Sequence, residues 1–494
     1  MKFPLLSRPY SDVSLSPERG AELETLADRV LDATITEFRD FVHKQHRTLP
    51  PSQWKPVKTT DGVTVYKELG DASDRAQSVL DCRRESGSGL LPKMLAVGTV
   101  HRPLHDLMLA NVLPDAATVL VKSSCTMEEF VDCLVIQELH PATDDSADPF
   151  RYSAVKWLAK THSVALNAVA APRDIVAVQS SGLRPEENIG YLILHSVDLP
   201  ECPSLEKTHG IVRSNVSVVT IFHELSPTST EVYVTAYSAR TGSTPESIVV
   251  SRVASHMATA WVTDAFILNT KLEWVLDQSQ RSTNQLLTRA SLIEVCGLCE
   301  RSPKRALTGK KRRLKVCGVC HAAVCHRCRV KKVLVHADDR LRISTSKHRV
   351  CTNCMLRVAK EDARTVMAAK NAYRIANRPT SKNGMKTSFS LLSHSRSTTG
   401  LKAKERSFDS LVIEEPQTQE PVSTNTEDTW SVEMVPPTPT HKPLEPQPCA
   451  DTIVSLCGSF RHGLVQHDAE STANGPEDIR DRTGHNEPPR AIRQ

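Results

Sequence analysis

Apolar residues recur at helical spacing near the start of the chain. Between Glu18 and Lys44 they return every three or four positions, which places them on one face of a helix. The proline pair Pro50-Pro51 ends this pattern. We therefore predict a flexible segment over residues 1–18 and then an amphipathic helix, whose apolar face carries Leu23, Leu26, Val30, Ile35, Phe38 and Phe41.

Short apolar runs bounded by turn residues fill the chain between this helix and residue 240. Asp61-Gly62 is a dipeptide typical of tight hairpin turns, so Val57 to Tyr66 should form a hairpin. Residues 90–111 carry helical periodicity that is interrupted at Pro103. Further strands are expected at residues 76–84, within 118–139, and at 153–158, 173–179, 190–197, 212–225 and 230–238.

A long amphipathic pattern follows the predicted strands. Pro245 suits the first turn of a helix, and the apolar stripe continues to about Gln278. We predict one uninterrupted helix with the stripe Val249, Val253, Met257, Trp261, Ala265, Leu268, Leu272 and Val275. A first helix, a sheet of many strands and a closing helix together predict an α+β domain over residues 19–285.

The last part of the chain has a different composition. A short helix is expected over residues 361–378. Residues 379–494 are rich in Ser, Thr, Pro and Gln and contain only four aromatic residues. Such a segment cannot bury enough apolar surface to fold alone, so we expect a disordered tail. Its Pro-rich steps, such as Pro436-Pro437-Thr438-Pro439, are typical of segments that bind partner proteins.

Eight of the 14 cysteines form four Cys-x-x-Cys pairs between the two predicted helical parts. Two such pairs supply the four thiolates of a tetrahedral zinc site, so four pairs predict two zinc ions. Only four residues separate the second and third pairs, which favours an interleaved arrangement. One ion would be held by Cys296, Cys299, Cys325 and Cys328, and the other by Cys317, Cys320, Cys351 and Cys354.

A disulfide framework is the alternative for these cysteines. The chain starts Met-Lys-Phe-Pro-Leu-Leu-Ser, an apolar run too short for a secretory signal, and disulfides persist in oxidising compartments. We therefore favour zinc. With a thiolate at every ligand position, both ions would be structural and not catalytic.

Residues 290–360 resemble the FYVE-type zinc finger, a cross-brace module whose members mostly bind phosphatidylinositol 3-phosphate on endosomal membranes. Arg349-Val350-Cys351 matches the Arg-Val-Cys signature of that family. The chain departs from the family before its first cysteine, where the Trp-x-x-Asp signature is absent, and before Cys317, where the paired histidines are absent. The resemblance implies that Arg313, Lys315 and Arg349 contact the lipid headgroup.

The α+β region resembles the START-like helix-grip fold. Arg173-Asp174 after Pro172 matches the Arg-Asp of that family at the head of a central strand, and Gly242-x-x-Pro245 matches the approach to its last helix. The resemblance implies a cavity for an apolar lipid. Val253, Met257, Trp261 and Ala265 are the candidates to line it, and a plain packed core is the alternative for this stripe.

Charge points to an anionic partner independently of these resemblances. Residues 296–354 contain 16 Lys and Arg against three acids, and Lys310-Lys311-Arg312-Arg313 lies at their centre. A basic surface is attracted to an anionic membrane leaflet. Nucleic acid is disfavoured because the segment lacks interleaved aromatics that stack on bases. A solvated charge run that offsets the thiolates is the remaining alternative.

These patterns together predict a non-enzymatic lipid-binding adaptor, cytoplasmic and peripheral on endosomal-type membranes. The chain contains no nucleophile elbow, phosphate loop, metalloprotease helix or kinase signature. A zinc-dependent protein-interaction module without lipid specificity is the second hypothesis. A RING-like ubiquitin ligase is the third, although RING fingers usually include a histidine ligand and here thiols fill all eight positions.

Overall fold

The computed structural model describes residues 3–5, 8–70, 91–126, 128, 130–145, 147–161, 171–239, 245–281, 295–302 and 313–377. The predicted strand at 76–84, the basic residues 310–312 and the predicted tail 379–494 lie outside these ranges. The chain divides into two units, residues 1–401 and 402–494, and all described residues belong to the first.

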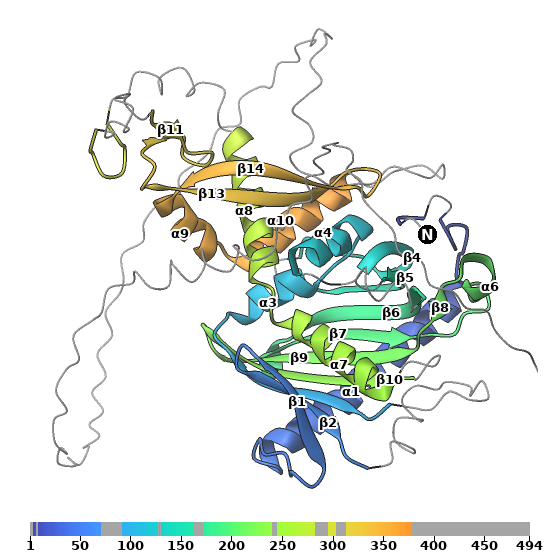
Figure 1. Ribbon diagram of the computed structural model, residues 1–494. Coiled ribbons are helices and arrows are strands. Elements are labelled where there is room, and N and C mark those ends of the chain that lie inside the picture. The colour runs from blue at the N-terminus through green and yellow to red at the C-terminus, as the bar shows by residue number, and fades with distance from the viewer. Residues whose placement is uncertain are drawn as a thin grey trace, which may run out of the picture. The chain divides into compact units, whose positions relative to one another are not determined.

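A ten-stranded sheet is the centre of this unit (Figure 1). Its strands hydrogen-bond in the order β1-β2-β3-β10-β9-β7-β6-β5-β4, each antiparallel to its neighbour, and the short β8 pairs parallel with β6. The strands are β1 (Trp54–Thr60), β2 (Val63–Glu68), β3 (Met94–Val100), β4 (Phe130–His140), β5 (Tyr152–Lys160), β6 (Arg173–Arg184), β7 (Ile189–Ser196), β8 (Val212–Arg213), β9 (Val216–Ser226) and β10 (Ser229–Ser238).

The hairpin predicted around Asp61-Gly62 is confirmed. It joins β1 to β2, and both turn residues have positive φ, at 56° and 83°. Glycine is needed at the second position, because a Cβ on Gly62 would lie 2.7 Å from the carbonyl oxygen of Thr99. Asp61-Gly62 therefore fixes the register of the first two strands.

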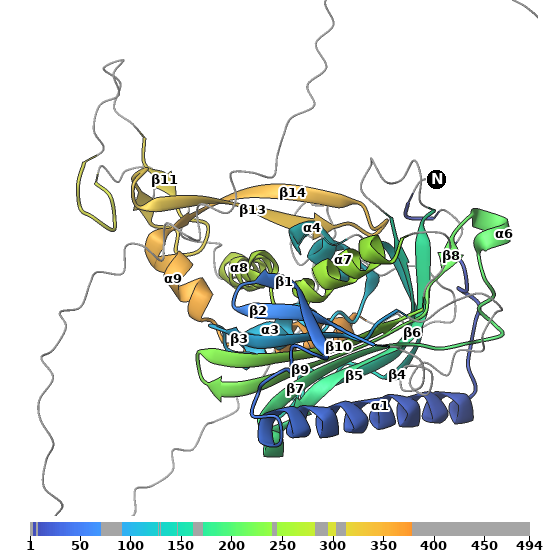
Figure 2. The ribbon, with the colours of Figure 1, turned by 60° about the horizontal axis from the view of Figure 1, so that its bottom comes forward.

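The first helix covers one face of the sheet, as Figure 2 shows. Helix α1 spans Pro17–His43, and the Ser16 hydroxyl accepts a hydrogen bond from the Arg19 amide at 3.2 Å to cap its first turn. The predicted apolar face is the buried one, and it packs on the large residues Trp157 and Tyr191 of the sheet. Leu5 and Leu15, in the segment expected to be flexible, are buried in the same core.

Two predictions of secondary structure are wrong between residues 90 and 139. The first half of the expected helix at 90–111 is strand β3, because this run pairs with β2 and β10 in the middle of the sheet. The start of the expected strand at 118–139 is helix α4 (Ala116–Thr126). The Asp115 carboxylate accepts a hydrogen bond from the Thr118 amide at 2.7 Å and so caps the start of that helix. The segment is therefore helical although its β-branched residues favour a strand.

Helix α3 (Leu104–Asn111) precedes α4, and both are largely buried. In the part of the chain that the structure describes, none of the helices is by itself long and apolar enough to cross a bilayer. Helices α3 and α4 taken together meet the length and composition criteria, with a bend of 116° between them. The short elements η1 (Pro185–Glu187) and α6 (Glu206–His209) complete this region.

The closing helix is not continuous, so this prediction is wrong as well. Helix α7 (Glu246–Met257) ends in the 3₁₀ turn η2 (Ala258–Ala260), and α8 (Asp264–Arg281) begins after it. Trp261 lies at this break, where its side chain is fully buried and its indole N–H donates to the Thr60 carbonyl at 3.1 Å. Helix α7 lies on the sheet face opposite α1 (Figure 2).

The cysteine-rich region is built on helix α8. Leu272, Val275 and Leu276 are buried in one cluster with Cys296, Cys317 and Val350. The elements of this region are β11 (Lys315–Val316), β12 (Ala323–Val324), β13 (Arg329–Ala337), β14 (Ile343–Cys351), α9 (Thr352–Lys360) and α10 (Ala363–Ala376). Helix α10 then returns to the α+β region, where Arg374 donates to the Asp115 carboxylate at 3.0 Å.

One side chain fastens the hairpin β13–β14 to α8. Asn269 is 5% exposed, accepts from the Val335 amide at 2.8 Å and donates to the Val335 carbonyl at 3.2 Å. The N–H and C=O of one residue in an antiparallel strand point to the same side, so Asn269 bonds one side of β13 at Val335. Because β13 pairs with no strand other than β14 among the described residues, we assign these bonds to its outer edge.

Replacing Asn269 should expose that edge. We expect Asn269→Ala to leave two backbone groups without partners, at a cost of about 1–3 kcal/mol each. Hydrogen exchange of the Val335 amide, measured in the full chain, should then accelerate about 10-fold or more. Asn377→Ala is the matched control, because the exposed Asn377 side chain bonds only within its own helix turn. Unchanged exchange at Val335 would contradict this role of Asn269.

Candidate metal centre and ligand cavity

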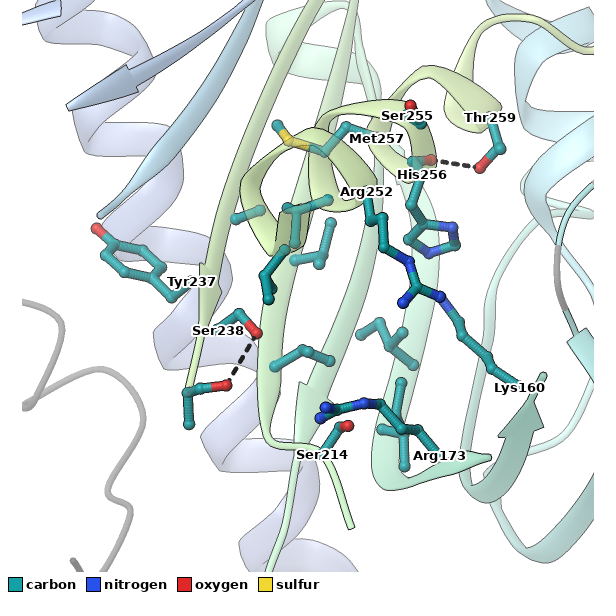
Figure 3. Close-up of a pocket in the computed structure, with 18 of the residues that line it drawn as sticks. Lys160, Arg173, Ser214, Tyr237, Ser238, Arg252, Ser255, His256, Met257 and Thr259 are labelled. Carbon is teal, nitrogen blue, oxygen red and sulfur yellow. Dashed lines mark hydrogen bonds between the residues drawn. The ribbon is translucent and has the colours of Figure 1, made fainter. Parts of the chain in front are cut away.

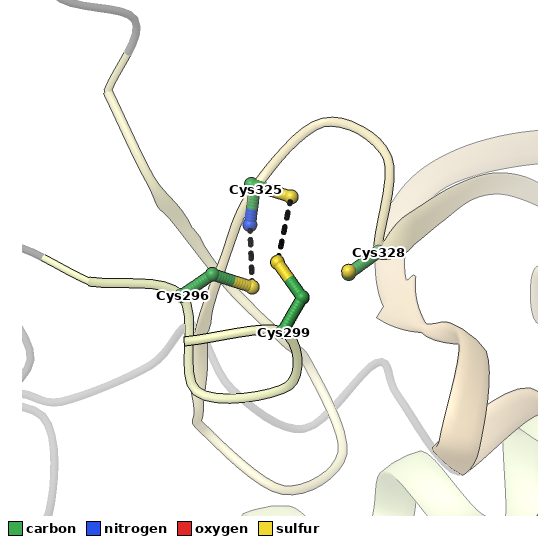
Figure 4. Close-up of side chains that lie close together, drawn as sticks. All are labelled: Cys296, Cys299, Cys325 and Cys328. Atoms are coloured by element: carbon green, nitrogen blue, oxygen red, sulfur yellow. Dashed lines mark hydrogen bonds between the residues drawn. The ribbon is translucent and has the colours of Figure 1, made fainter. Parts of the chain in front are cut away.

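The eight paired cysteines form two groups of four. Cys296, Cys299, Cys325 and Cys328 make the first group, shown in Figure 4, and Cys317, Cys320, Cys351 and Cys354 make the second. Within each group all sulfur atoms lie within 4.8 Å of one another. The interleaved grouping predicted from the spacing is therefore the one that the structure contains.

Each group begins with a tight turn that presents two sulfurs to one side. In the first, the Glu300 amide donates to the Cys296 carbonyl at 2.8 Å, and in the second the His321 amide donates to the Cys317 carbonyl at 3.0 Å. Glu300 and His321 both have positive φ, at 54° and 57°. The two Cys-x-x-Cys turns are thus built alike.

The sulfur geometry fits a tetrahedral zinc ion. A tetrahedron with metal–sulfur distances of about 2.3 Å has sulfur–sulfur edges of about 3.8 Å. The distance from Cys299 Sγ to Cys325 Sγ is 3.9 Å, and that from Cys320 Sγ to Cys351 Sγ is 3.8 Å. Four thiol donors at this spacing are typical of structural zinc sites.

Electrostatics also favours a cation in each group. Although burial opposes it, backbone amides, first that of Cys325, lower the pKa of Cys296 to about 6. Burial and the neighbouring thiols then raise the pKa of Cys328 to about 12. Four thiols so close together cannot all ionise without a positive charge between them, and a divalent ion supplies it.

The three predicted headgroup residues are exposed around the second group. Arg313 and Lys315 lie before Cys317, and Arg349 lies on β14. The Gly318 amide donates to the Arg349 carbonyl at 2.8 Å, which joins the segment after β11 to β14. Arg349 pairs directly with Lys331 of β13, and both side chains are exposed.

A cavity of about 340 Å³ lies between α7 and the sheet. Figure 3 shows side chains of α7, including Arg252, His256 and Met257, above it, and Arg173 and Ser214 at its opposite side. Its apolar lining consists of Ile175, Leu194, Val216, Val218, Ala236, Val249, Val253 and Met257, together with the alanine methyl of Ala239. Of the four predicted lining residues, Val253 and Met257 are among these.

The other two predicted lining residues lie elsewhere. Trp261 is fully buried in the core around α3 and the indole N–H bonds to Thr60, and Ala265 lies in the first turn of α8. Neither lines the cavity. Helical periodicity predicts both residues on one stripe, and that periodicity ends where the helix breaks at η2.

Sequence reasoning missed the charged lining of the cavity. Lys160, Arg173 and Arg252 line it together with Glu128. Arg173 belongs to the Arg-Asp motif, but Lys160 and Arg252 carried no signal of their own. To predict that Lys160 lies beside Arg173, one would have to know the register between β5 and β6.

Two further lining groups have defined charge states. The Glu128 carboxylate lies 3.1 Å from the Lys122 ammonium, and this cation holds the pKa of Glu128 below its usual range although burial opposes it. Burial and then the charge of Lys160 lower the pKa of His256 to about 3. His256 is therefore neutral near pH 7.

Comparison with known proteins gives structural similarity only. No family model matches the chain, and no curated protein matches it. The solved human StAR-related lipid transfer protein 5 is similar over 51% of this chain and 99% of its own, with 17% identity and a TM-score of 0.33. The lipid transfer and protein localization domain of human StarD13 is similar over 47% and 95%, with 12% identity and a TM-score of 0.31. Human STARD10 is similar over 45% and 77%, with 14% identity and a TM-score of 0.30.

The metal prediction is tested by stoichiometry. We expect elemental analysis of the purified full chain to give two zinc ions per chain, and Cys325→Ser to lower this number by at least one. Cys125→Ser, a thiol outside both groups, should leave the zinc content unchanged. A folded wild-type chain without zinc would contradict the metal sites.

Proposed function

We propose that the chain is a non-enzymatic lipid-binding adaptor. In this proposal the space between α7 and the sheet holds a lipid, and the cysteine-rich region, folded around two zinc ions, docks the chain on phosphoinositide-bearing membranes of the endosomal type. The observation that carries the proposal is the cavity under α7, because a packed core would have left no such space.

The size and lining of the cavity support a lipid. Ligand pockets are typically about 300–1,000 Å³, lined mostly by apolar side chains with a few polar groups. The cavity of about 340 Å³ has this character, and a second space of about 120 Å³ adjoins it. The two spaces share Glu128, Leu194, Val218, His256, Met257 and Thr259.

The surface of the cysteine-rich region supports membrane docking. Around the second cysteine group the exposed cations Arg313, Lys315 and Arg349 lie with Val316, an apolar side chain that is 37% exposed. On the hairpin, Lys347 pairs with Val333, which is 46% exposed. Exposed cations interspersed with exposed apolar groups suit a bilayer surface, where headgroups are anionic and the layer beneath is apolar.

Filling the cavity tests the lipid. We expect native mass spectrometry of the full chain, incubated with a cellular lipid extract, to show a bound lipid. Val253→Trp places a large side chain in the cavity and should abolish this binding. Ile248→Trp is the matched control, since Ile248 lies on the same helix but is 42% exposed. A wild-type chain that never carries a lipid would count against the proposal.

Vesicle co-sedimentation tests the docking. We expect the full chain to bind phosphoinositide vesicles, and Arg349→Ala to weaken binding about 10-fold or more while zinc content stays at two, since a charged hydrogen bond contributes about 1.5–3 kcal/mol. Arg29→Ala, on the exposed side of α1, is the control. Equal binding to all anionic lipids would show that the surface attracts membranes by its positive charge and does not recognise a particular headgroup. Failure with every vesicle at low salt would favour the protein-interaction hypothesis.

A further inference from the structure

Two polar side chains from different elements lie where the two spaces under α7 meet. The larger space has a volume of about 340 Å³ and the smaller one about 120 Å³. Glu128, between α4 and β4, and His256, on α7, line both of them. Figure 3 shows the His256 ring extending from α7 into the larger space. The junction is therefore polar, although most of the lining around it is apolar.

Glu128 is an ionised carboxylate whose hydrogen-bonding capacity is largely unused. Its side chain is 2% exposed, and the Lys122 ammonium, 3.1 Å from Oε1, holds the pKa of this carboxyl below its usual range although burial opposes it. Oε1 nevertheless accepts no well-aligned hydrogen bond, and no other described residue donates to the carboxylate. A carboxylate can accept about four hydrogen bonds, and leaving a buried acceptor unfilled is costly. Glu128 therefore calls for a hydrogen-bond donor from a ligand.

Three further side chains of the smaller space form no hydrogen bond with the described residues. They are the neutral imidazole of His256, the amide of Gln179 on β6 and the hydroxyl of Thr220 on β9. Gln179 pairs with Leu194, and Thr220 with Leu192, and all four line this space. Direct partners point to the same face of a sheet, so the strand register brings the amide and the hydroxyl to the cavity. The buried Thr220 is only 4% exposed.

Other polar side chains of the same lining are satisfied within the protein. The Asn111 amide donates at 2.8 Å to the carbonyls of both Leu107 and Ala260. The Thr259 hydroxyl donates at 2.6 Å to the carbonyl of His256. Asn111 and Thr259 thus hold the surrounding backbone in place, whereas the groups without such bonds can serve a ligand.

The charges at the junction favour an uncharged ligand group. Glu128 and Lys122 form a balanced ion pair, so an ion of either sign bound there would meet a like charge. The charge of Lys160 also acts on this place, because burial and then this cation lower the pKa of His256 to about 3. A hydroxyl group avoids these repulsions, and it can donate to a carboxylate and accept from an amide.

We propose that the smaller space binds the hydroxyl-bearing end of an uncharged lipid, one hydroxyl of which donates to the Glu128 carboxylate. This inference rests on the proposed lipid-binding function. A second oxygen of the same end bonds to Gln179 and Thr220. The hydrocarbon chain lies in the larger space, along Val249 and Val253 of α7. Such a ligand replaces water at these polar groups and keeps their hydrogen bonds.

Ligands that share a hydrocarbon chain and differ in their polar end test this. The full chain, stripped of lipid, is loaded with the uncharged dye Nile red, which is then displaced by decane-1,2-diol, 1,2-dimethoxydecane, decanoate or decyltrimethylammonium below their micelle concentrations. The dimethoxy compound keeps both oxygens but has no donor, and it is more apolar than the diol. We expect the diol to displace the dye at about 10-fold or more lower concentration than each of the others, because only the diol can donate to Glu128.

Variants of similar size locate the hydroxyl end. Glu128→Gln should bring the diol within a few fold of the dimethoxy compound while Nile red still binds, which also shows that the variant is folded. Thr220→Val and Gln179→Met each remove a neutral partner and should lower the preference by about 2- to 10-fold. Thr235→Val is the matched control, because Thr235 pairs with Val219, which packs in the core on the α1 side of the sheet. It should keep the wild-type preference.

The outcomes separate this inference from the function on which it rests. Equal displacement by the diol and the dimethoxy compound, or stronger displacement by either ion, overturns the hydroxyl site and leaves the lipid cavity standing. A preference for the diol that survives Glu128→Gln overturns the assignment to Glu128. Should Glu128→Gln not bind Nile red, an unchanged preference in both Thr220→Val and Gln179→Met overturns the site. Failure of the wild-type chain to bind Nile red and all four ligands overturns the lipid cavity itself.

Discussion

The burial of Trp261 between α7 and α8 is the constraint on which the rest of the structure depends. Its indole is fully buried and bonds to the last residue of β1, which anchors the chain to the sheet at the point where α7 has ended. The break leaves α7 over the cavity and sends α8 in a new direction. One aromatic side chain thus separates the helix that covers a ligand space from the helix that supports the cysteine-rich region.

Helix α8 makes that region part of the same core. Leu272, Val275 and Leu276 pack against the cysteine groups, and Glu273 lies within ion-pair distance of His336 on β13 and Lys370 on α10. Small zinc fingers have too little apolar surface to fold without metal. Here α8 adds apolar surface from outside the finger, so a fragment that starts after residue 285 would lack part of its own core.

The sequence was most informative where chemistry depends on spacing along the chain. Four Cys-x-x-Cys pairs with a four-residue central gap were enough to predict which pairs meet, and Asp61-Gly62 was enough to predict a hairpin. Sequence patterns did not predict the structure where it is set by contacts between residues that are distant in the chain. At the break, Trp261 bonds to Thr60, about 200 positions earlier in the chain, and the first turn of α4 is capped by Asp115 although its β-branched residues favour a strand. The cations in the cavity became visible only through the register of β5 and β6.

Pairs of cations lie directly opposite each other in two places, on the hairpin of the cysteine-rich region and at the wall of the cavity. Each cysteine group with its zinc ion would carry a net charge of about −2, so cations near it partly serve as counter-charges. Lys331 and Arg349 are nevertheless exposed and directly opposed across the hairpin, an arrangement that repels and that solvent can screen. Lys160 and Arg173 are also direct partners, at the half-buried ends of β5 and β6, and both line the cavity. In both places the register of a strand pair, and not spacing along the sequence, brings the two cations together.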